Sequence, residues 1–236
     1  MSDGNFHYEQ KLLENELVAV EPFDPSEHVA PCMEVIKASP EVFTYIAFPD
    51  VQTGEDLLTK FCNPISAMPS ACLFMVIDKK ASEGRGHRDP QGRGEYAGIL
   101  LLTATDTVNA VTEVGILIFP AFQRSHVTAN AIGLLLCYTL DPPSAGGLGL
   151  RRVEWKCHAG HEKSRKTALK MGFEFEGVAR WARVWEGAQG LPVEKLERRN
   201  GTIGEIPGRH TASYSIVWDE WDAKRPLVIE QMQRKC

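Results

Sequence analysis

The chain has 236 residues and a mass of 26.2 kDa, which is enough for one well-filled hydrophobic core. Hydrophobic residues make up 43% and charged residues 24%, so the composition excludes a mostly disordered chain, a collagen-like repeat and a disulfide miniprotein. The net charge is −5, and the chain therefore lacks the overall basic charge that nonspecific nucleic-acid binding uses. No apolar run has the length of a membrane helix, and the polar N-terminus shows no secretory signal. We therefore expect a cytoplasmic protein without nucleic-acid or membrane partners.

The cysteines indicate free thiols rather than a metal site. None of the six shows C-x-x-C spacing, and no histidine cluster lies beside them. Cys72, Cys137 and Cys157 lie within apolar runs, which is typical of buried thiols in a reducing compartment. We therefore expect neither disulfides nor a bound metal ion.

Hydrophobic periodicity along the chain predicts alternating strands and helices in one mixed α/β domain. In chain order, we predict a strand over 16–22, a helix over 25–39, irregular structure over 40–50 and a helix over 53–65. Next come strands over 72–78, 96–106 and 110–119, a helix over 127–140, a strand over 151–159 and a helix over 161–171. The last elements are strands over 173–187 and 210–221 and a helix over 225–235.

Two polar, glycine-rich stretches interrupt this order. The segment ASEGRGHRDPQGRGE (81–95) predicts a mobile hairpin insertion, and residues 188–208 form a second polar insertion. The chain shows no internal repeat and no interdomain linker. We therefore expect a single domain over 1–236 that carries both insertions.

The segment TEVGILIFPAFQRSHVTANA (112–131) predicts an anion site. A buried strand ends at Phe119, Pro120 interrupts it, and a polar turn leads directly into an apolar helix. Such a turn presents free backbone N–H groups and the positive end of a helix dipole. Arg124 and His126 add donors suited to a pyrophosphate. An ordinary strand-to-helix connection with solvated side chains explains the same residues, and the segment alone does not decide between the two.

Several segments together resemble a known family. The strand, the turn QRSHVT, the helix and RRVEWKCHAGHEKSR, followed by Gly172-Phe173, resemble the Gcn5-related N-acetyltransferase (GNAT) superfamily. The resemblance is closer to its branch of ribosomal-protein-alanine acetyltransferase homologues, where these segments commonly read QRT-R-x-x-T-E-A and RRVEWKC-D-A-x-N-x-x-S-R. It covers roughly 14–185 and 210–221 and is strongest over 112–135 and 151–180.

The resemblance implies acyl transfer from acetyl-coenzyme A, as co-substrate, to an amine. It implies a mixed α/β fold in which a mostly antiparallel central sheet, flanked by helices, splays after its fourth strand and admits the thioester arm. Backbone groups near Ile116 and Ile118 would pair with the pantetheine, and Ser164 and Arg165 match positions that commonly meet the coenzyme. The turn residues would hold the pyrophosphate; these are Gln123, Arg124, Ser125, His126, Val127 and Thr128.

The chain departs from the family pattern at several positions. His126 and Thr128 occupy the glycine positions of the signature, His161 replaces a usual asparagine and His158 a usual aspartate. Ala168 stands where the superfamily often has a tyrosine as general acid. Another residue or water would then protonate the leaving thiolate, and a thiol with a pKa of about 8.5 needs no dedicated acid.

Four side chains are candidates for catalysis and acceptor binding. Glu113 lies on the strand beside the splay and is the best-placed carboxylate for a general base, but an exposed salt-bridge residue fits the pattern too. His161 titrates near neutrality without perturbation, although a surface histidine at a helix start is the ordinary alternative. Trp155 and Trp181 are candidates for an acceptor pocket, and packing in the core is their ordinary alternative.

These observations favour an N-acetyltransferase that moves an acetyl group from acetyl-coenzyme A to a primary amine, on a small molecule or a protein N-terminus. A catalytically silent relative that binds acyl-coenzyme A as a sensor or scaffold is the first alternative. A nucleotide-phosphate-binding module is the second, but neither G-x-x-x-x-G-K-[ST] nor a strand-linked G-x-G-x-x-G is present. We expect a monomer or homodimer and expect both insertions to border the acceptor side.

Overall fold

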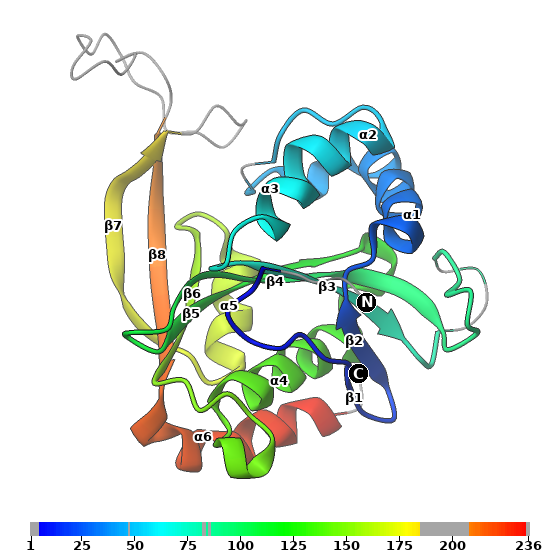
Figure 1. Ribbon diagram of the computed structural model, residues 1–236. Coiled ribbons are helices and arrows are strands. Elements are labelled where there is room, and N and C mark those ends of the chain that lie inside the picture. The colour runs from blue at the N-terminus through cyan, green and yellow to red at the C-terminus, as the bar shows by residue number, and fades with distance from the viewer. Residues whose placement is uncertain (1–4, 47, 82–83, 85, 185–207, 235–236) are drawn as a thin grey trace, which may run out of the picture.

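The computed structural model describes residues 5–46, 48–81, 84, 86–184 and 208–234, and these residues form one eight-stranded sheet with helices on both faces (Figure 1). The strand order is β1-β2-β3-β4-β5-β6-β8-β7, and every neighbouring pair is antiparallel except β5 and β6. The predicted mixed α/β class with a mostly antiparallel sheet is confirmed. The strands are β1 Leu13–Glu14, β2 Val18–Pro22, β3 Cys72–Asp78, β4 Glu95–Asp106, β5 Val111–Ile118, β6 Arg152–His158, β7 Glu174–Val184 and β8 Gly208–Val217.

The helices form two layers around the sheet. On one side lie α1 (Pro25–Ala38), α2 (Gly54–Leu57) and α3 (Asn63–Ser66), and on the other α4 (His126–Leu140) and α6 (Trp218–Gln233), with α5 (Glu162–Lys170) after β6 (Figure 1). The sequence of α4 is apolar almost all round because the helix is buried between the sheet and α6. At Gly133 the two helices approach so closely that a Cβ atom would meet the Met232 sulfur at 2.3 Å. No helix in the described ranges is long and apolar enough to span a membrane.

The predicted helix over 53–65 forms in three pieces. Its start follows the sequence signal, because Thr53 and Asp56 make a reciprocal capping box. A single π-helical turn at Leu58–Cys62 then separates α2 from α3. Pro64 has no N–H to donate to the preceding turn and its ring needs room there, and the wider π turn supplies that room.

The C-terminal boundary differs from the prediction. We predicted a strand over 210–221 and a helix over 225–235, but β8 ends at Val217 and α6 begins at Trp218 and continues through Pro226. Trp218 and Trp221, which the predicted strand included, lie in the first turn of α6. Trp221 faces the core, where its indole Nε1 donates to Asp141 Oδ1 at 2.7 Å.

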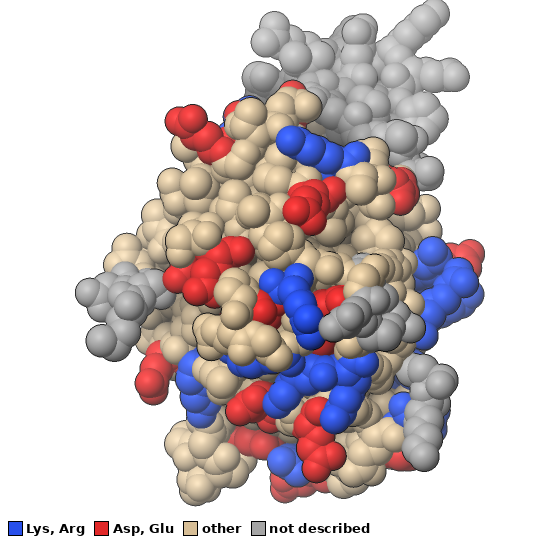
Figure 2. All heavy atoms as spheres, turned by 90° about the vertical axis from the view of Figure 1, so that its right-hand side faces the viewer, with Lys and Arg blue, Asp and Glu red and all other residues tan. Residues whose placement is uncertain are grey.

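Where it is described, the first insertion carries buried side chains that contact the sheet. Asp89 is only 2% exposed and Glu95 3%. Arg93 donates to both carboxylate oxygens of Glu21 on β2, at 2.6 and 3.0 Å, and to both of Asp89, at 2.8 and 3.0 Å. Basic and acidic side chains are correspondingly interspersed over the face of the molecule shown in Figure 2. The second insertion, 188–208, lies outside the described residues except for Gly208, the first residue of β8.

Replacing the central arginine of this cluster should destabilise the fold. Arg93→Ala leaves two largely buried carboxylates facing each other, so we expect a loss of about 3 kcal/mol in the free energy of unfolding. Urea unfolding at pH 7 measures the loss. Arg234→Ala breaks an exposed ion pair with Glu230 and should cost less than about 1 kcal/mol. Equal losses of unfolding free energy in the two variants would contradict a larger stabilising contribution from Arg93 than from an exposed ion pair.

The same cluster predicts a pH dependence of stability. Burial raises the pKa of Glu21, but hydrogen bonds from His28 and Arg93 outweigh it and the pKa is lowered; the pKa of Asp89 is lowered in the same way by Arg93. A carboxyl whose pKa is lower in the folded state stabilises the fold above its unfolded pKa of about 4. This stabilisation is lost as the pH falls through the pKa values that the two carboxyls have in the folded state. Because Arg93 lowers both pKa values, Arg93→Ala should lose less stability over the same pH range.

Candidate active site

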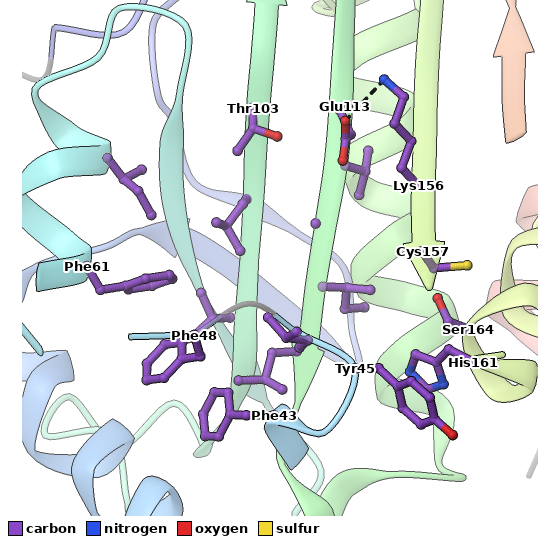
Figure 3. A pocket seen from close by; sticks show the side chains of 18 of the residues that line it. Phe43, Tyr45, Phe48, Phe61, Thr103, Glu113, Lys156, Cys157, His161 and Ser164 are labelled. Atoms are coloured by element: carbon purple, nitrogen blue, oxygen red, sulfur yellow. Dashed lines mark ion pairs between the residues drawn. The ribbon is translucent and has the colours of Figure 1, made fainter. Parts of the chain in front are cut away.

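A cavity of about 450 Å³ passes through the sheet where β5 and β6 separate. The two strands pair in parallel only from Val111 to Glu113, opposite Arg152 to Glu154, and then diverge. Lining residues come from both faces, including Glu113 and Lys156 on the α1–α3 side and Trp155, Cys157 and Ser164 on the other. Figure 3 shows Phe43, Phe48 and Phe61 forming an apolar wall across from Lys156 and His161.

The edge of β5 that faces the opening carries backbone groups without a partner strand. Phe119 N donates to Ala97 O, so the alternation of an antiparallel ladder makes the odd-numbered residues of β5 bond to β4. Val114, Ile116 and Ile118 therefore direct their N–H and C=O groups away from β4. The Val114 N–H belongs to the last β5–β6 bridge, opposite Glu154, and the groups that follow it face the splay. The carbonyl of Ile118 accepts Gln123 Nε2 at 3.1 Å, which ties the end of the strand to the following turn. Ile116 also lines the cavity, whereas the side chain of Ile118 is buried in the core.

The turn before α4 has the geometry of an anion site. Arg124 adopts a left-handed conformation with φ of 60°, and Ser125 caps the helix by accepting Val127 N at 3.3 Å. Within the described part of the chain, the amides of Arg124, Ser125 and His126 make no hydrogen bond. Val127 is fully buried, so only its backbone belongs to the turn, and Thr128 is half-buried.

A buried carboxylate holds the side chain that replaces a family glycine. His126 Nε2 donates to Asp78 Oδ1 at 2.9 Å, and Asp78, at the end of β3, is fully buried. This bond directs the imidazole toward β3 and away from the turn's amides. The departure at His126 is therefore compatible with an open anion site.

Glu113 is ion-paired inside the cavity. Its Oε2 lies 3.3 Å from Lys156 Nζ (Figure 3). The same Nζ donates to Glu154 Oε2 at 2.6 Å. Arg152 continues the network from Glu154 to Glu176 on β7. Glu113 is a candidate predicted from the sequence and Lys156 is not. Alternation puts Lys156 on the same face of β6 as Glu154, and the pairing of Glu154 with Glu113 brings that face to Glu113.

His161 lies in the cavity in a stacked contact that the sequence analysis did not anticipate. Its ring is parallel to that of Tyr45, with centroids 4.3 Å apart and an angle of 9° between the planes. Burial lowers the pKa of His161, and the neighbouring charges of Lys163, His158 and Arg209 lower it further. The imidazole is therefore neutral at physiological pH and has a free electron pair to accept a proton.

The remaining candidates divide between the cavity and its surroundings. Trp155 lines the cavity but is almost fully buried, and its Nε1 donates to Ser164 Oγ at 3.0 Å. Arg165 is not a lining residue, because its guanidinium donates to Tyr214 Oη at 2.8 Å and to the Ala159 carbonyl at 3.2 Å. Ala168 is fully buried in the core.

Trp181 lies outside the cavity lining, and the structure places it on the back of the β7–β8 hairpin. It is 51% exposed, and its backbone N donates to His210 Nδ1 at 2.9 Å. The described part of the first insertion likewise supplies no lining residue. It lies beside the start of α4, since a Cβ atom on Gly86 would touch the Phe122 ring at 2.8 Å. The lining residues that were not predicted from the sequence include Phe43, Tyr45, Phe48, Phe61, Lys156, Arg183 and Arg209.

Comparisons with known proteins agree with this architecture. The acetyltransferase (GNAT) domain model matches residues 18–174, whereas no curated protein matches the sequence. The crystal structure of a GCN5-related N-acetyltransferase from Brucella melitensis is similar with a TM-score of 0.72 and 25% identity, over 96% of this chain and 87% of that one.

Two further crystal structures share the fold at lower identity. A probable acetyltransferase of the GNAT family from Chromobacterium violaceum has a TM-score of 0.68 and 22% identity, over 91% of this chain and 90% of that one. RimL, a ribosomal L7/L12 alpha-N-protein acetyltransferase in complex with coenzyme A, has a TM-score of 0.63 and 16% identity, over 89% and 99%. Since the domain model spans well over half of the sequence, the chain belongs to the GNAT acetyltransferase family and is an acyl-CoA-dependent acetyltransferase.

Proposed function

We propose that the protein transfers an acetyl group from acetyl-coenzyme A to a primary amine, on a small molecule or a protein N-terminus. The observation that carries this proposal is the cavity through the splay. It joins the open edge of β5 on one side to Glu113 and His161, two groups able to accept a proton. The acetyl donor and the amine can therefore approach each other from opposite faces of the sheet.

The residues around the splay fit a coenzyme A molecule. The C=O of Val114 and the N–H and C=O of Ile116 are strand-edge groups available to the amides of the pantetheine arm. The free amides of Arg124, Ser125 and His126, at the start of a 15-residue helix, suit the pyrophosphate. Ser164 lines the cavity beyond the end of the paired segment and can meet the sulfur end of the arm.

The chemistry requires one proton to leave the nitrogen and one to reach the sulfur. Glu113 or His161 takes the proton as the amine nitrogen bonds to the acetyl carbonyl carbon. The acetyl donor supplies a thioester, whose carbon–sulfur bond breaks with the electron pair going to sulfur. Because Ala168 offers no acid, the proton that completes the thiol comes from water, or passes through the Ser164 hydroxyl from the protonated base. The apolar wall of Phe43, Phe48 and Phe61 limits water near the reacting atoms.

Thiol release from acetyl-coenzyme A, measured with a panel of primary amines, tests the proposed reaction. Mass spectrometry should find the acetyl group on the amine nitrogen in amounts equal to the thiol released. Thiol release without an acetylated amine, or coenzyme binding without thiol release, would contradict the proposal. The second result would favour the sensor or scaffold alternative.

Arg124 should contribute to coenzyme affinity. Arg124→Gln removes a cation at the anion turn, so we expect acetyl-coenzyme A binding to weaken by about 1–3 kcal/mol, the usual value of a charge-assisted hydrogen bond. Calorimetry measures the change, and Arg180→Gln, an exposed β7 residue outside the cavity, serves as control. The loss should persist with dephospho-coenzyme A, which retains the pyrophosphate. Unchanged affinity in a folded variant would remove Arg124 from the site.

A further inference from the structure

On the α1–α3 side of the sheet, the cavity forms an apolar chamber. Leu101 on β4 and Gly115 on β5 are register partners, and both line it. They are only half-buried, although β4 and β5 lie in the middle of the sheet. Leu100 and Leu102, which point to the opposite face, are fully buried. The helical layer therefore leaves open space over Leu101 and Gly115, and we call this pair the chamber floor.

The residues that cover the chamber floor from the helical side are apolar or aromatic. Phe43 and Phe48 stack with ring centroids 4.1 Å apart, and Phe48 meets Phe61 at 5.0 Å. All three rings of this apolar wall are half-buried and line the cavity (Figure 3). Among the described residues from 32 to 65, no lining side chain carries a charge. A ligand group placed here would exchange water for apolar surface on two sides.

The π-helical turn Leu58–Cys62 keeps one row of side chains over the chamber. Leu57, Phe61 and Ile65 follow one another at intervals of four residues, and all three line the cavity. In a regular α-helix an interval of four residues exceeds one turn by about 40°, so such a row drifts around the helix. A π turn takes more residues per turn and reduces this drift. Turns of this kind are frequent at functional sites, and here the turn holds Phe61 against Phe48.

The chamber exceeds what the acyl donor needs. A cavity of about 150 Å³ holds a benzene ring, and this one measures about 450 Å³. The family is one of acetyltransferases, so the donor carries only a methyl group beyond the reacting carbonyl. The strand-edge groups assigned to the pantetheine arm lie in the gap between β5 and β6, beside the chamber floor. The apolar surface of the chamber is therefore not needed to bind the donor.

The chamber floor lies close to the groups able to accept the proton. Gly115 follows Glu113 by two residues on β5, so the two lie on one face, about 7 Å apart along the strand. Glu113 and His161 line the same cavity. A two-carbon linker spans the distance from an amine nitrogen beside Glu113 to a ring over the chamber floor. Gly115 has no side chain, which leaves room for a ring against the strand.

We propose that the acceptor is a primary amine carried on an apolar, ring-sized group, and that the chamber floor and the apolar wall bind this group. The inference rests on the proposed amine acetylation and names the class of acceptor. The phenylalanine rings of the wall favour an aromatic ring, because stacked and edge-to-face contacts add to the free energy of apolar burial. A polyamine is disfavoured, since its second charge would lose its hydration among uncharged side chains.

Two acceptors of the same shape test the inference. We would compare kcat/KM for 2-phenylethylamine and 2-(pyridin-4-yl)ethylamine with saturating acetyl-coenzyme A, above neutral pH, where the pyridine ring is uncharged. The two share the amine, the linker and the ring shape, and they differ in one ring nitrogen at the end far from the amine. The wild-type protein should prefer the phenyl compound by about tenfold or more, because the pyridine nitrogen gives up its hydrogen bonds to water on entering the chamber.

Substitutions in the wall connect this preference to the chamber. Phe48→Ala opens the wall to water, so the ratio of the two kcat/KM values should fall toward one, and Phe43→Ala should lower it in the same direction. Phe23→Ala is the matched control, because it removes a half-buried phenylalanine that contacts His28 on α1 and does not line the cavity. It should leave the ratio unchanged. The ratio does not depend on the fraction of folded enzyme, so a destabilised variant still gives a valid answer.

Several results would overturn the inference. These are equal kcat/KM for the two acceptors in the wild-type protein, a preference that survives both wall substitutions, and a higher kcat/KM for a peptide with an N-terminal alanine than for 2-phenylethylamine. A higher kcat/KM for hexanoyl-coenzyme A than for acetyl-coenzyme A, with the same amine, would assign the chamber to the acyl chain and would overturn it as well.

Binding measurements separate this inference from the proposed reaction. If no amine is acetylated, the proposed function fails, and calorimetry with the alcohols 2-phenylethanol and 2-(pyridin-4-yl)ethanol still tests the chamber. Tighter binding of 2-phenylethanol that is lost in Phe48→Ala supports an apolar subsite without catalysis. Equal binding of the two alcohols rejects the subsite.

Discussion

Glu113→Gln should lower kcat by roughly 10²–10⁴ while leaving the Kd for acetyl-coenzyme A nearly unchanged. The substitution keeps the shape of the side chain and removes its ability to accept a proton. Glu113 lines the cavity on β5, beside the proposed position of the thioester arm, and its side chain keeps 18% exposure. Steady-state kinetics with saturating acetyl-coenzyme A, together with calorimetry, separates the effect on kcat from the effect on binding.

Glu154→Gln provides a closely matched control for this variant. Glu154 is the register partner of Glu113 and bonds to the same Lys156 Nζ, but it does not line the cavity. It should therefore keep kcat near the wild-type value. Equal losses of kcat in both variants would mean that the effect comes from removing a negative charge beside Lys156, and not from removing a base. Normal kcat in Glu113→Gln would reject the base role and leave His161 as the candidate.

The parts of the site that could be predicted from sequence are those encoded by consecutive residues. The turn from Gln123 to Thr128, its helix and the two strands beside the splay depend on local patterns of apolar residues, proline and a capping serine. The family resemblance added the splay itself. These local signals predict the turn and the strand edge to which the proposed function assigns the coenzyme.

The side of the cavity proposed for the acceptor could not be predicted because it depends on register and on packing between distant segments. Tyr45 lies in a stretch without periodicity, and only tertiary packing brings its ring onto His161, more than a hundred residues later. Arg183 faces the cavity because of a bulge, and a one-residue change in register would reverse its direction. The same bulge turns Trp181 away, so the composition of β7 could not show which of its side chains reach the cavity.

His161 offers a second route for the proton, and its replacement by asparagine distinguishes a base from a positioning residue. Asparagine is common at this position in the branch that the chain resembles, and it can hydrogen-bond but cannot accept a proton near neutrality. If His161 is the base, His161→Ala and His161→Asn should both lower kcat by roughly 10²–10⁴. If it only positions the acceptor, His161→Asn should retain most of the activity that His161→Ala loses.

The pH profile gives an independent test of the same role. Because burial and neighbouring cations lower the pKa of His161, the base form persists below its ordinary value of about 6.5 and is lost only at more acidic pH. Loss of the acceptor's own ammonium proton gives log kcat/KM a slope of about one below the amine pKa, and a titrating enzyme base steepens it to about two below the pKa of His161. This steeper limb should disappear in His161→Asn and persist in Glu113→Gln. The reverse pattern would assign the base to Glu113. A slope of one throughout in all three proteins would mean that catalysis consists mainly of holding an already neutral amine against the thioester.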